Sequence, residues 1–228
     1  MLGETVLFLD GEALIIDKPA GLPVDRPRDG AISLENHLNS LTFGFKRWPQ
    51  PVHRLDRDTS GCLLLSRNPK AHARFQQAFE SGAVRKRYLA VLDGVPAGES
   101  GEIDLPLAKV STRERGWWMT GDAKKGKAAR TAWRLLEARD GLALVEFRPA
   151  TGRTHQIRVH ALEGLGHAVL GDPVYGQAHP AGMMLHAAEL VVPRAGKADA
   201  AAVAPWPERF AKVGFGDPGT APDNGPDA

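Results

Sequence analysis

The sequence predicts an α+β domain with a largely antiparallel sheet and flanking helices. Short apolar runs of strand length recur along the chain and are separated by turn residues. The 25 glycines and 17 prolines among 228 residues favour many turns over long helices. With 43% apolar and 25% charged residues, the composition is that of a globular protein with a sizeable core.

The chain begins with two predicted strands and an ordered loop. Residues 5–9 and 13–17 are apolar runs on either side of Asp10-Gly11, which is typical of a strand, a turn and a second strand. Residues 18–23 follow as a loop, because two prolines and a glycine exclude regular structure there.

A helix and a buried strand are predicted next. Ser33 is placed to cap a helix whose apolar face carries Leu34, Leu38 and Leu41. Residues 61–66 are mostly apolar and predict a strand that is buried in the core.

A second helix and a strand follow. Asn68 predicts an N-cap and Pro69 a first helical turn, and Gly82 predicts the end of this helix. The run 84–92 begins with alternating residues and ends apolar, as expected for a strand that enters a core.

The second half of the chain is predicted to hold a hairpin, a helix and a last strand. Asp140-Gly141 between the apolar runs 131–137 and 142–147 is a strong hairpin signal. Residues 151–162 predict a loop that leads into a helix, and residues 183–192 predict the last strand.

We expect one domain over residues 1–193 and a C-terminal extension over 194–228. The extension is rich in Ala, Gly, Pro and Asp, and we expect it to be disordered from about Gly216. Before that point three aromatic side chains can dock on the domain: Trp206, Phe210 and Phe215.

Several classes of protein are disfavoured by composition. No run approaches the ~18 apolar residues of a membrane span, and the N-terminus lacks the order of a signal peptide. The single cysteine, Cys62, excludes an intramolecular disulfide and a multi-cysteine zinc site. We therefore expect a cytoplasmic protein without a membrane partner.

The net charge is only +2, but the charges are unevenly distributed along the chain. Residues 45–87 hold ten lysines and arginines against three acids, and residues 109–134 hold eight against two. Two basic stretches in a near-neutral chain favour an anionic partner, of which nucleic acid is the usual one. The alternative is that these cations are dispersed over a solvated surface.

The first candidate site is the segment 53–61, with the sequence HRLDRDTSG, directly before the predicted buried strand. A loop at the end of a core strand holds reactive groups rigidly. Arginines beside Asp56 would keep this carboxylate ionised as a base or nucleophile. The alternative is a polar turn in which Asp58 or Thr59 caps the local backbone.

The second candidate site is the segment 151–160, with the sequence TGRTHQIRVH. On a helix, His155 and Arg158 would share a face. An arginine near a helix start favours a nearby anion such as a carboxylate or phosphate. The alternative is a surface helix with Ile157 and Ala161 pointing inward.

Two further segments combine cations with aromatic residues. Residues 85–88 (RKRY) could clamp phosphates and stack Tyr88 on a base, or form a basic strand end with its tyrosine in the core. Trp117-Trp118, between Arg115 and Lys124, could be a stacking surface for RNA or the packing of a hairpin.

These segments resemble the signatures of the RluA-type RNA pseudouridine synthases, in the same order along the chain. The segment HRLDRDTSG is similar to the family's long first signature, and GRTHQIRVH, residues 152–160, is similar to its second. Four shorter segments also match: DKPAGL, KRYLA, GHAVLGD and LHA. The resemblance covers about residues 5–193, with Asp17, Ala168 and Gly182 as departures from the usual residues.

The resemblance implies an isomerase that converts uridine to pseudouridine in RNA. It implies a mixed α/β pseudouridine synthase domain with a basic cleft, and a compact member without a preceding S4-type RNA-binding domain. By resemblance, Asp56 is the catalytic aspartate, Tyr88 stacks on the target base, and Arg158 pairs with the aspartate. Arg54 matches the arginine that helps to displace the base.

The remaining expectations concern partners. We expect a monomer that binds a ribosomal or transfer RNA stem-loop and needs neither cofactor nor metal. Two alternatives remain: a non-catalytic RNA-binding or ribosome-assembly factor, and a metal-dependent phosphoesterase using His53, Asp56 and Asp58. The other residues expected to contact RNA are Arg54, Arg57, Thr59, Arg85, Lys86, Arg87, Arg153, His155, Leu185 and His186.

Overall fold

The computed structural model describes residues 2–27 and 30–219. The strands are β1 (Val6–Leu9), β2 (Ala13–Lys18), β3 (Gln50–Pro51), β4 (Ser60–Ser66), β5 (Arg85–Leu92), β6 (Ser100–Asp104), β7 (Leu107–Thr112), β8 (Gly116–Gly121), β9 (Arg130–Arg139), β10 (Leu142–Pro149), β11 (Leu185–Val192) and β12 (Ala200–Val203). The α-helices are α1 (Pro69–Glu80), α2 (Gln156–Val159) and α3 (Glu208–Ala211). The 3-10 helices are η1 (Leu2–Thr5) and η2 (Leu34–Leu41), and a π-helical turn, η3, spans His160–Gly164.

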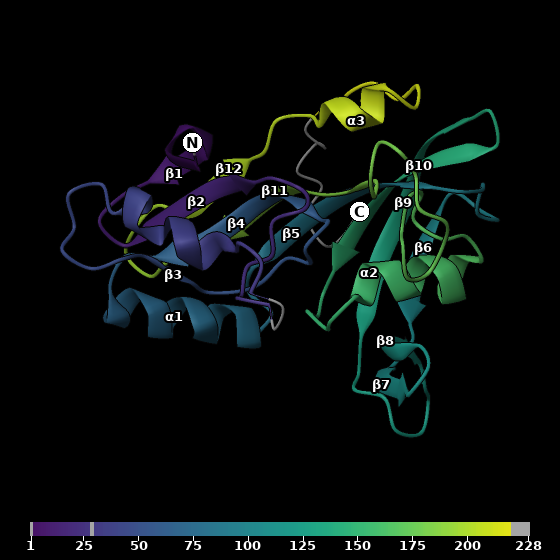
Figure 1. Cartoon of the computed structure of the whole chain (residues 1–228), viewed down its shortest axis with the longest axis horizontal. Coiled ribbons are helices and arrows are strands. Elements are labelled where there is room, and N and C mark those ends of the chain that lie inside the picture. Colours follow the sequence, from purple (N-terminus) through teal and green to yellow (C-terminus); the bar gives the residue numbers. More distant parts are fainter. Residues whose placement is uncertain (1, 28–29, 220–228) are drawn as a thin grey trace.

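Ten strands form one long sheet that runs through the whole molecule (Figure 1). Its order is β1-β2-β4-β11-β5-β10-β9-β6, with β3 paired to β4 and β12 paired to β11. Strands β4 and β11 run parallel, whereas the other pairs in this sheet are antiparallel. Strands β7 and β8 form a separate hairpin that projects from one half of the molecule. The predicted α+β class with a largely antiparallel sheet is confirmed.

Strand β4 is the centre of the first half, and all its side chains are buried. Leu64 packs with Phe75 of α1, while Leu63 and Leu65 pack with the apolar side of η2. Helix α1 begins as predicted, because the Asn68 side chain accepts a hydrogen bond from an amide of the first turn at 2.8 Å. The predicted helix after Ser33 is a 3-10 helix.

The second half of the sheet is covered on both faces. On one face, Val145 and Phe147 of β10 pack with Ile157 of α2. Another cluster joins Leu144 to Phe210 of the C-terminal segment. The β9–β10 hairpin turns at Asp140-Gly141, where both residues have positive φ, 51° and 77°. This geometry is the reason that an Asp-Gly pair predicts a hairpin.

Of two predictions for the second half of the chain, one is wrong in detail and one is confirmed. The strand over 183–192 is not the last, because β12 pairs with β11 and sets Ala200 opposite Val192. The predicted loop that leads into a helix over 151–162 is confirmed: α2 begins at Gln156, directly after His155, whose backbone is left-handed with φ 55°.

The expected disorder falls mainly outside the described residues. Residues 216–219 are described, and the Gly219 carbonyl accepts a hydrogen bond from Arg87 at 3.0 Å. Residues 220–228 lie outside the described part of the chain. Within residues 2–27 and 30–219, no helix combines the length and apolar character needed to span a bilayer.

Candidate active site

Asp56 lies on the loop between β3 and β4, and local packing holds this loop in place. Leu55 is buried, and the Thr59 amide donates to the Asp56 carbonyl at 3.1 Å, which closes a tight turn. Gly61 follows with φ 106°, and a β carbon there would lie 2.2 Å from the Ala187 carbonyl oxygen. Glycine is therefore required for β4 to approach β11 and place the loop beside it.

A buried lysine, Lys18, also holds the loop that carries Asp56. The Nζ atom of Lys18 donates to the carbonyls of Pro19 and Leu22 at 2.8 Å and of Arg57 at 3.0 Å. Lys18 is fully buried, and this burial lowers its pKa to about 8. The ammonium group thus ties the loop after β2 to the turn that follows Asp56.

Arg158 of α2 bridges two aspartates. Its Nη1 atom donates to Asp56 Oδ2 at 3.1 Å. Its Nε and Nη2 atoms donate to the two carboxylate oxygens of Asp172 at 2.6 and 2.7 Å. The Arg158 side chain is 6% exposed and that of Asp56 19%, so water has little access to the bridge. The positively charged guanidinium of Arg158 is therefore held beside Asp56 in a fixed orientation.

Asp172 is built to hold Arg158. Its side chain is fully buried and also accepts hydrogen bonds from the amides of Val174 at 2.8 Å and Tyr175 at 3.1 Å. Burial alone would raise the pKa of Asp172, but the hydrogen bonds and charge of Arg158 hold it below its usual value. Asp172 therefore stays ionised.

Tyr88 of β5 lies between two core clusters and lines the same cavity as Asp56. Burial raises the pKa of its phenol well above the usual value, and the negative charge of Asp56 adds to the effect. The ring therefore stays protonated and presents a flat, neutral surface beside a carboxylate. Such a surface is suited to cover a planar base.

The cavity has a volume of about 490 Å³ and lies where the two halves of the sheet meet. Its walls come from the Asp56 loop, the end of α1, β5, the loop after β10 and α2. The predicted site residues that line it are Arg54, Asp56, Thr59, Lys86, Tyr88, Arg153, His155, Arg158 and Leu185.

Several lining cations are already held in place. Lys86 donates to the Thr151 carbonyl at 3.2 Å, and burial lowers its pKa to about 8. Arg153 donates through Nε to the Ala128 carbonyl at 3.0 Å. Arg54 is exposed and pairs with Asp25 at 2.9 Å. These groups make the mouth of the cavity basic and leave Arg54 accessible to a ligand.

The structure places four of the predicted RNA contacts away from this cavity. Arg57 is exposed and its Nε donates to the Gly21 carbonyl at 3.3 Å. Arg85 is exposed at the start of β5. Both can face solvent, but neither lines the cavity.

Arg87 and His186 are buried and do not line the cavity. Arg87 points into the protein and pairs with Glu146 at 2.5 Å, because β5 alternates its side chains between two faces. His186 is 1% exposed and its Nδ1 atom shares a hydrogen bond of 2.7 Å with the Ser60 hydroxyl. That bond joins β11 to the start of β4.

Asp172 and Tyr175 have roles that residue type and spacing did not predict. Gly171-Asp172 belongs to the segment GHAVLGD, which resembles the family. Asp172 is 14 residues from Arg158, so the sequence did not predict the contact between their side chains. The Tyr175 hydroxyl lies 2.8 Å from His155 Nδ1 and accepts a hydrogen bond from the Met119 amide at 2.9 Å. Tyr175 thus connects the β7–β8 hairpin to the residue before α2.

Trp117 and Trp118 both make packing contacts at the β7–β8 hairpin. Trp117 is 47% exposed and stacks on His155 with a centroid distance of 5.1 Å. Arg115 lies over the Trp118 ring at 4.5 Å. The hairpin therefore packs beside the cavity and still exposes an indole at its edge.

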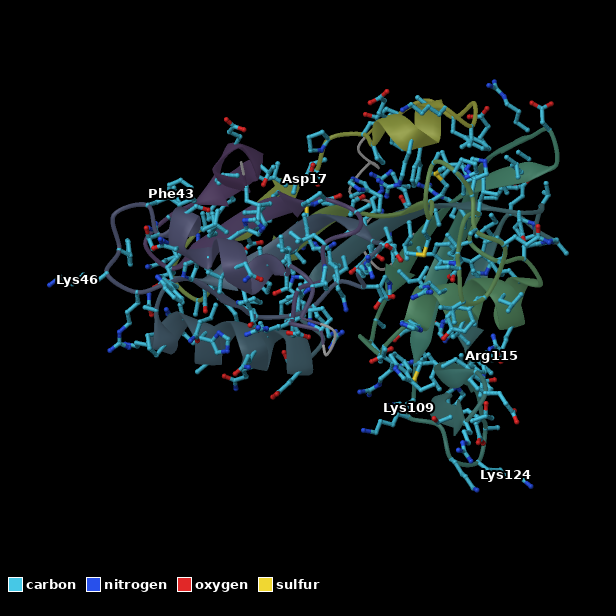
Figure 2. All side chains as sticks on the ribbon, viewed as in Figure 1. Asp17, Phe43, Lys46, Lys109, Arg115 and Lys124 are labelled. Carbon is cyan, nitrogen blue, oxygen red and sulfur yellow. The ribbon has the colours of Figure 1, made fainter. Side chains whose placement is uncertain are left out.

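Basic side chains extend to both ends of the molecule. Figure 2 shows Lys46 at one end, and Lys109 of β7 and Lys124 of the turn after β8 on the projecting part. Strand β5, which carries Tyr88, lies between them in Figure 1. In the described part of the chain, His53, Asp56 and Asp58 are not grouped as metal ligands.

Comparison with known proteins identifies the family of the chain. Residues 12–163 match the model of a family described as RNA pseudouridylate synthase. A Zymomonas mobilis protein named "uncharacterized RNA pseudouridine synthase" is 56% identical over 218 residues, covering 94% of this chain and 99% of that protein. Ribosomal large subunit pseudouridine synthase D of the same organism is 37% identical over 77% of this chain, which spans 57% of that protein.

Solved structures show the same fold. Human RNA Pseudouridylate Synthase Domain Containing 4 matches with a TM-score of 0.77 and 26% identity, covering 92% of this chain and 91% of that one. Human RNA Pseudouridylate Synthase Domain Containing 1 matches with a TM-score of 0.75 and 30% identity, over 89% and 83%. The chain therefore belongs to the RNA pseudouridylate synthase family and is an isomerase, an RNA pseudouridine synthase.

Proposed function

We propose that this isomerase acts on single uridines in ribosomal or transfer RNA, and that Asp56 is its catalytic carboxylate. The observation that carries the proposal is the bridge from Asp172 through Arg158 to Asp56 at the wall of a basic cavity. The name of the ribosomal large subunit relative supports ribosomal RNA as a substrate.

The target uridine leaves its stack and enters the cavity. Unstacking costs a few kcal/mol, which contacts between the RNA backbone and the basic surface offset. Arg54 is exposed at the cavity and is positioned to contact the displaced strand. Tyr88 covers the flat face of the uracil, as its place in the cavity wall allows.

The reaction moves one bond and one proton. The bond from ribose C1′ to uracil N1 breaks, the ring turns, and a new bond forms from C1′ to C5. C5 then loses its proton and N1 gains one, so the product is an isomer of the substrate. Asp56 acts at the ribose as nucleophile or base, and either role needs an ionised carboxylate. Arg158 keeps that charge oriented.

The experiment that tests the proposal compares RNA from a deletion strain with RNA from its parent. Pseudouridines are mapped by chemical probing in ribosomal and transfer RNA. We expect a defined uridine to lose its modification in the deletion strain and to regain it when the intact gene, but not its Asp56→Asn variant, is returned. Identical maps in the two strains would contradict the proposed substrates. We further propose that the protein acts as a cytoplasmic monomer.

A further inference from the structure

A second cavity lies at the opposite end of α1 from the active site. Its volume is about 400 Å³, and it lies between the segment 46–50 and the start of α1. The residues important for its chemistry are Lys46, Arg47, Trp48 and Arg67. We propose that this cavity binds an unpaired nucleotide of the RNA substrate, several positions away from the target uridine. The inference rests on the proposed function, because it assumes an RNA substrate.

The first argument is the exposure of an aromatic side chain. Trp48 is 59% exposed, whereas Trp133 in the core is 8% exposed. An exposed indole offers a flat apolar face on which a planar ligand can stack. Stacking on an exposed aromatic ring is the common way in which proteins hold unpaired bases, and it tolerates any base.

The second argument is the charge around this indole. Within the described residues, no ion pair joins Lys46 or Arg47 to an acid, and no Asp or Glu lines the cavity. Arg67 is 6% exposed and uses its guanidinium on carbonyl groups and on the Phe45 ring, so its charge is not neutralised by a contacting carboxylate. A cavity with several cations and no acid selects an anionic ligand.

The third argument is the position of the cavity relative to the active site. Helix α1 contributes Pro69 to this cavity and Phe79 and Glu80 to the active-site cavity. Twelve helical residues span about 18 Å. At about 3.4 Å per stacked nucleotide of one strand, this distance corresponds to about five nucleotides. One RNA strand can therefore reach both cavities along α1.

Two oligouridylates of different length distinguish binding at one cavity from binding at both. We use fluorescein-labelled single strands of 4 and 12 uridines and measure their affinity by fluorescence anisotropy. The 12-mer is long enough to reach both cavities, and the 4-mer is not. We expect Trp48→Ala to weaken binding of the 12-mer about tenfold and to weaken binding of the 4-mer much less, because the 4-mer can still bind at the active-site cavity. Trp48→Phe keeps an aromatic ring and should retain most of the affinity.

Matched controls separate stacking from general charge. Lys46→Ala should weaken 12-mer binding, whereas Lys212→Ala, which removes an exposed lysine directly after α3, should not. Oligoglutamate with the same number of negative charges as the 12-mer should fail to displace it. The fluorescence of Trp48, assigned by its loss in Trp48→Phe, should change when the 12-mer is added.

Several results would overturn the inference. These are equal affinities of the parent protein for the two strands, an equal loss for both in Trp48→Ala, and full displacement by oligoglutamate. Failure of the proposed function is a separate result, because it appears as unchanged pseudouridine maps whatever the anisotropy shows. Since Trp48 is largely exposed, its variants should unfold at the parent temperature, and this is checked first.

Discussion

Asp172 holds Arg158 by two hydrogen bonds of 2.6 and 2.7 Å and leaves Nη1 of the arginine for Asp56. Both partners of this pair are buried, so the pair stabilises the fold and also orients the charge beside the candidate catalytic group. Breaking a buried ion pair leaves an uncompensated charge, which costs far more than the loss of an exposed pair. The site is therefore sensitive to residues that do not touch the cavity.

Asp172→Asn should lower the unfolding free energy by about 3 kcal/mol and slow the conversion of bound RNA. The amide removes the negative charge, and Arg158 loses the group that orients it. Denaturant unfolding and single-turnover kinetics measure the two effects. The matched control is Glu208→Gln, which removes a carboxylate from an exposed pair with Lys212 and should change stability by less than about 0.5 kcal/mol. Similar losses in both variants would contradict this explanation.

Arg158→Lys should also fail, although it keeps the positive charge. An ammonium group cannot make two parallel bonds to Asp172 and reach Asp56 at the same time. We expect the single-turnover rate to fall by about 100-fold while RNA affinity changes little. A variant that binds RNA several-fold more weakly, yet converts it at the parent rate, would show that Arg158 serves a phosphate instead.

Gly61→Ala should be strongly destabilising. The new β carbon would lie 2.2 Å from the Ala187 carbonyl oxygen, and the backbone at φ 106° disfavours a side chain. A loss of about 3 kcal/mol in unfolding free energy is expected from overpacking and strain. Gly11→Ala is the matched control, because a β carbon there meets nothing within 4 Å. Equal stability of the two variants would mean that β4 and β11 are further apart.

His186 predicts a dependence of stability on pH. Burial, followed by the charge of Arg209, lowers its pKa to about 3 in the folded protein, from 6.5. Because the pKa of His186 is lower in the folded protein, the unfolded chain binds a proton below about pH 6.5 and the folded protein does not. The stabilisation by neutral His186 is therefore present above pH 6.5 and is lost as the pH falls toward 3. From pH 7.5 to 5.5 the loss is about 1 kcal/mol. In His186→Gln, the unfolding free energy measured with denaturant should fall less between pH 7.5 and 5.5 than in the parent protein. An equal fall in both proteins would contradict the assignment to His186.

Local patterns in the sequence predicted most elements of the fold. The Asn68-Pro69 start of α1 and the Asp140-Gly141 hairpin depend on neighbouring residues, so short segments contain the whole signal. Strand β12 was missed because its alanine-rich sequence lacks the large apolar residues typical of strands, and it is held by pairing with β11. Long-range pairing of that kind leaves no local signal.

The same distinction applies to the site. Asp56, Tyr88 and Arg158 were named from segments that resemble a family, and all three line one cavity. The burial of Arg87 against Glu146 depends on which face of β5 each side chain takes, which the charged run RKRY does not reveal. The contact between Arg158 and Asp172 depends on a turn 14 residues later in the chain. Tertiary structure, rather than residue type, decides both cases.

The central claim is that the Asp56 carboxylate performs the isomerisation. The most direct measurement is single-turnover formation of pseudouridine, with enzyme in excess over the RNA identified by mapping, for Asp56→Asn and the matched variant Asp58→Asn. Asp56 lines the cavity and bonds to Arg158, whereas Asp58 does not line it. We expect Asp56→Asn to bind RNA and form no pseudouridine, while Asp58→Asn stays near the parent rate. Normal turnover by Asp56→Asn would contradict the account.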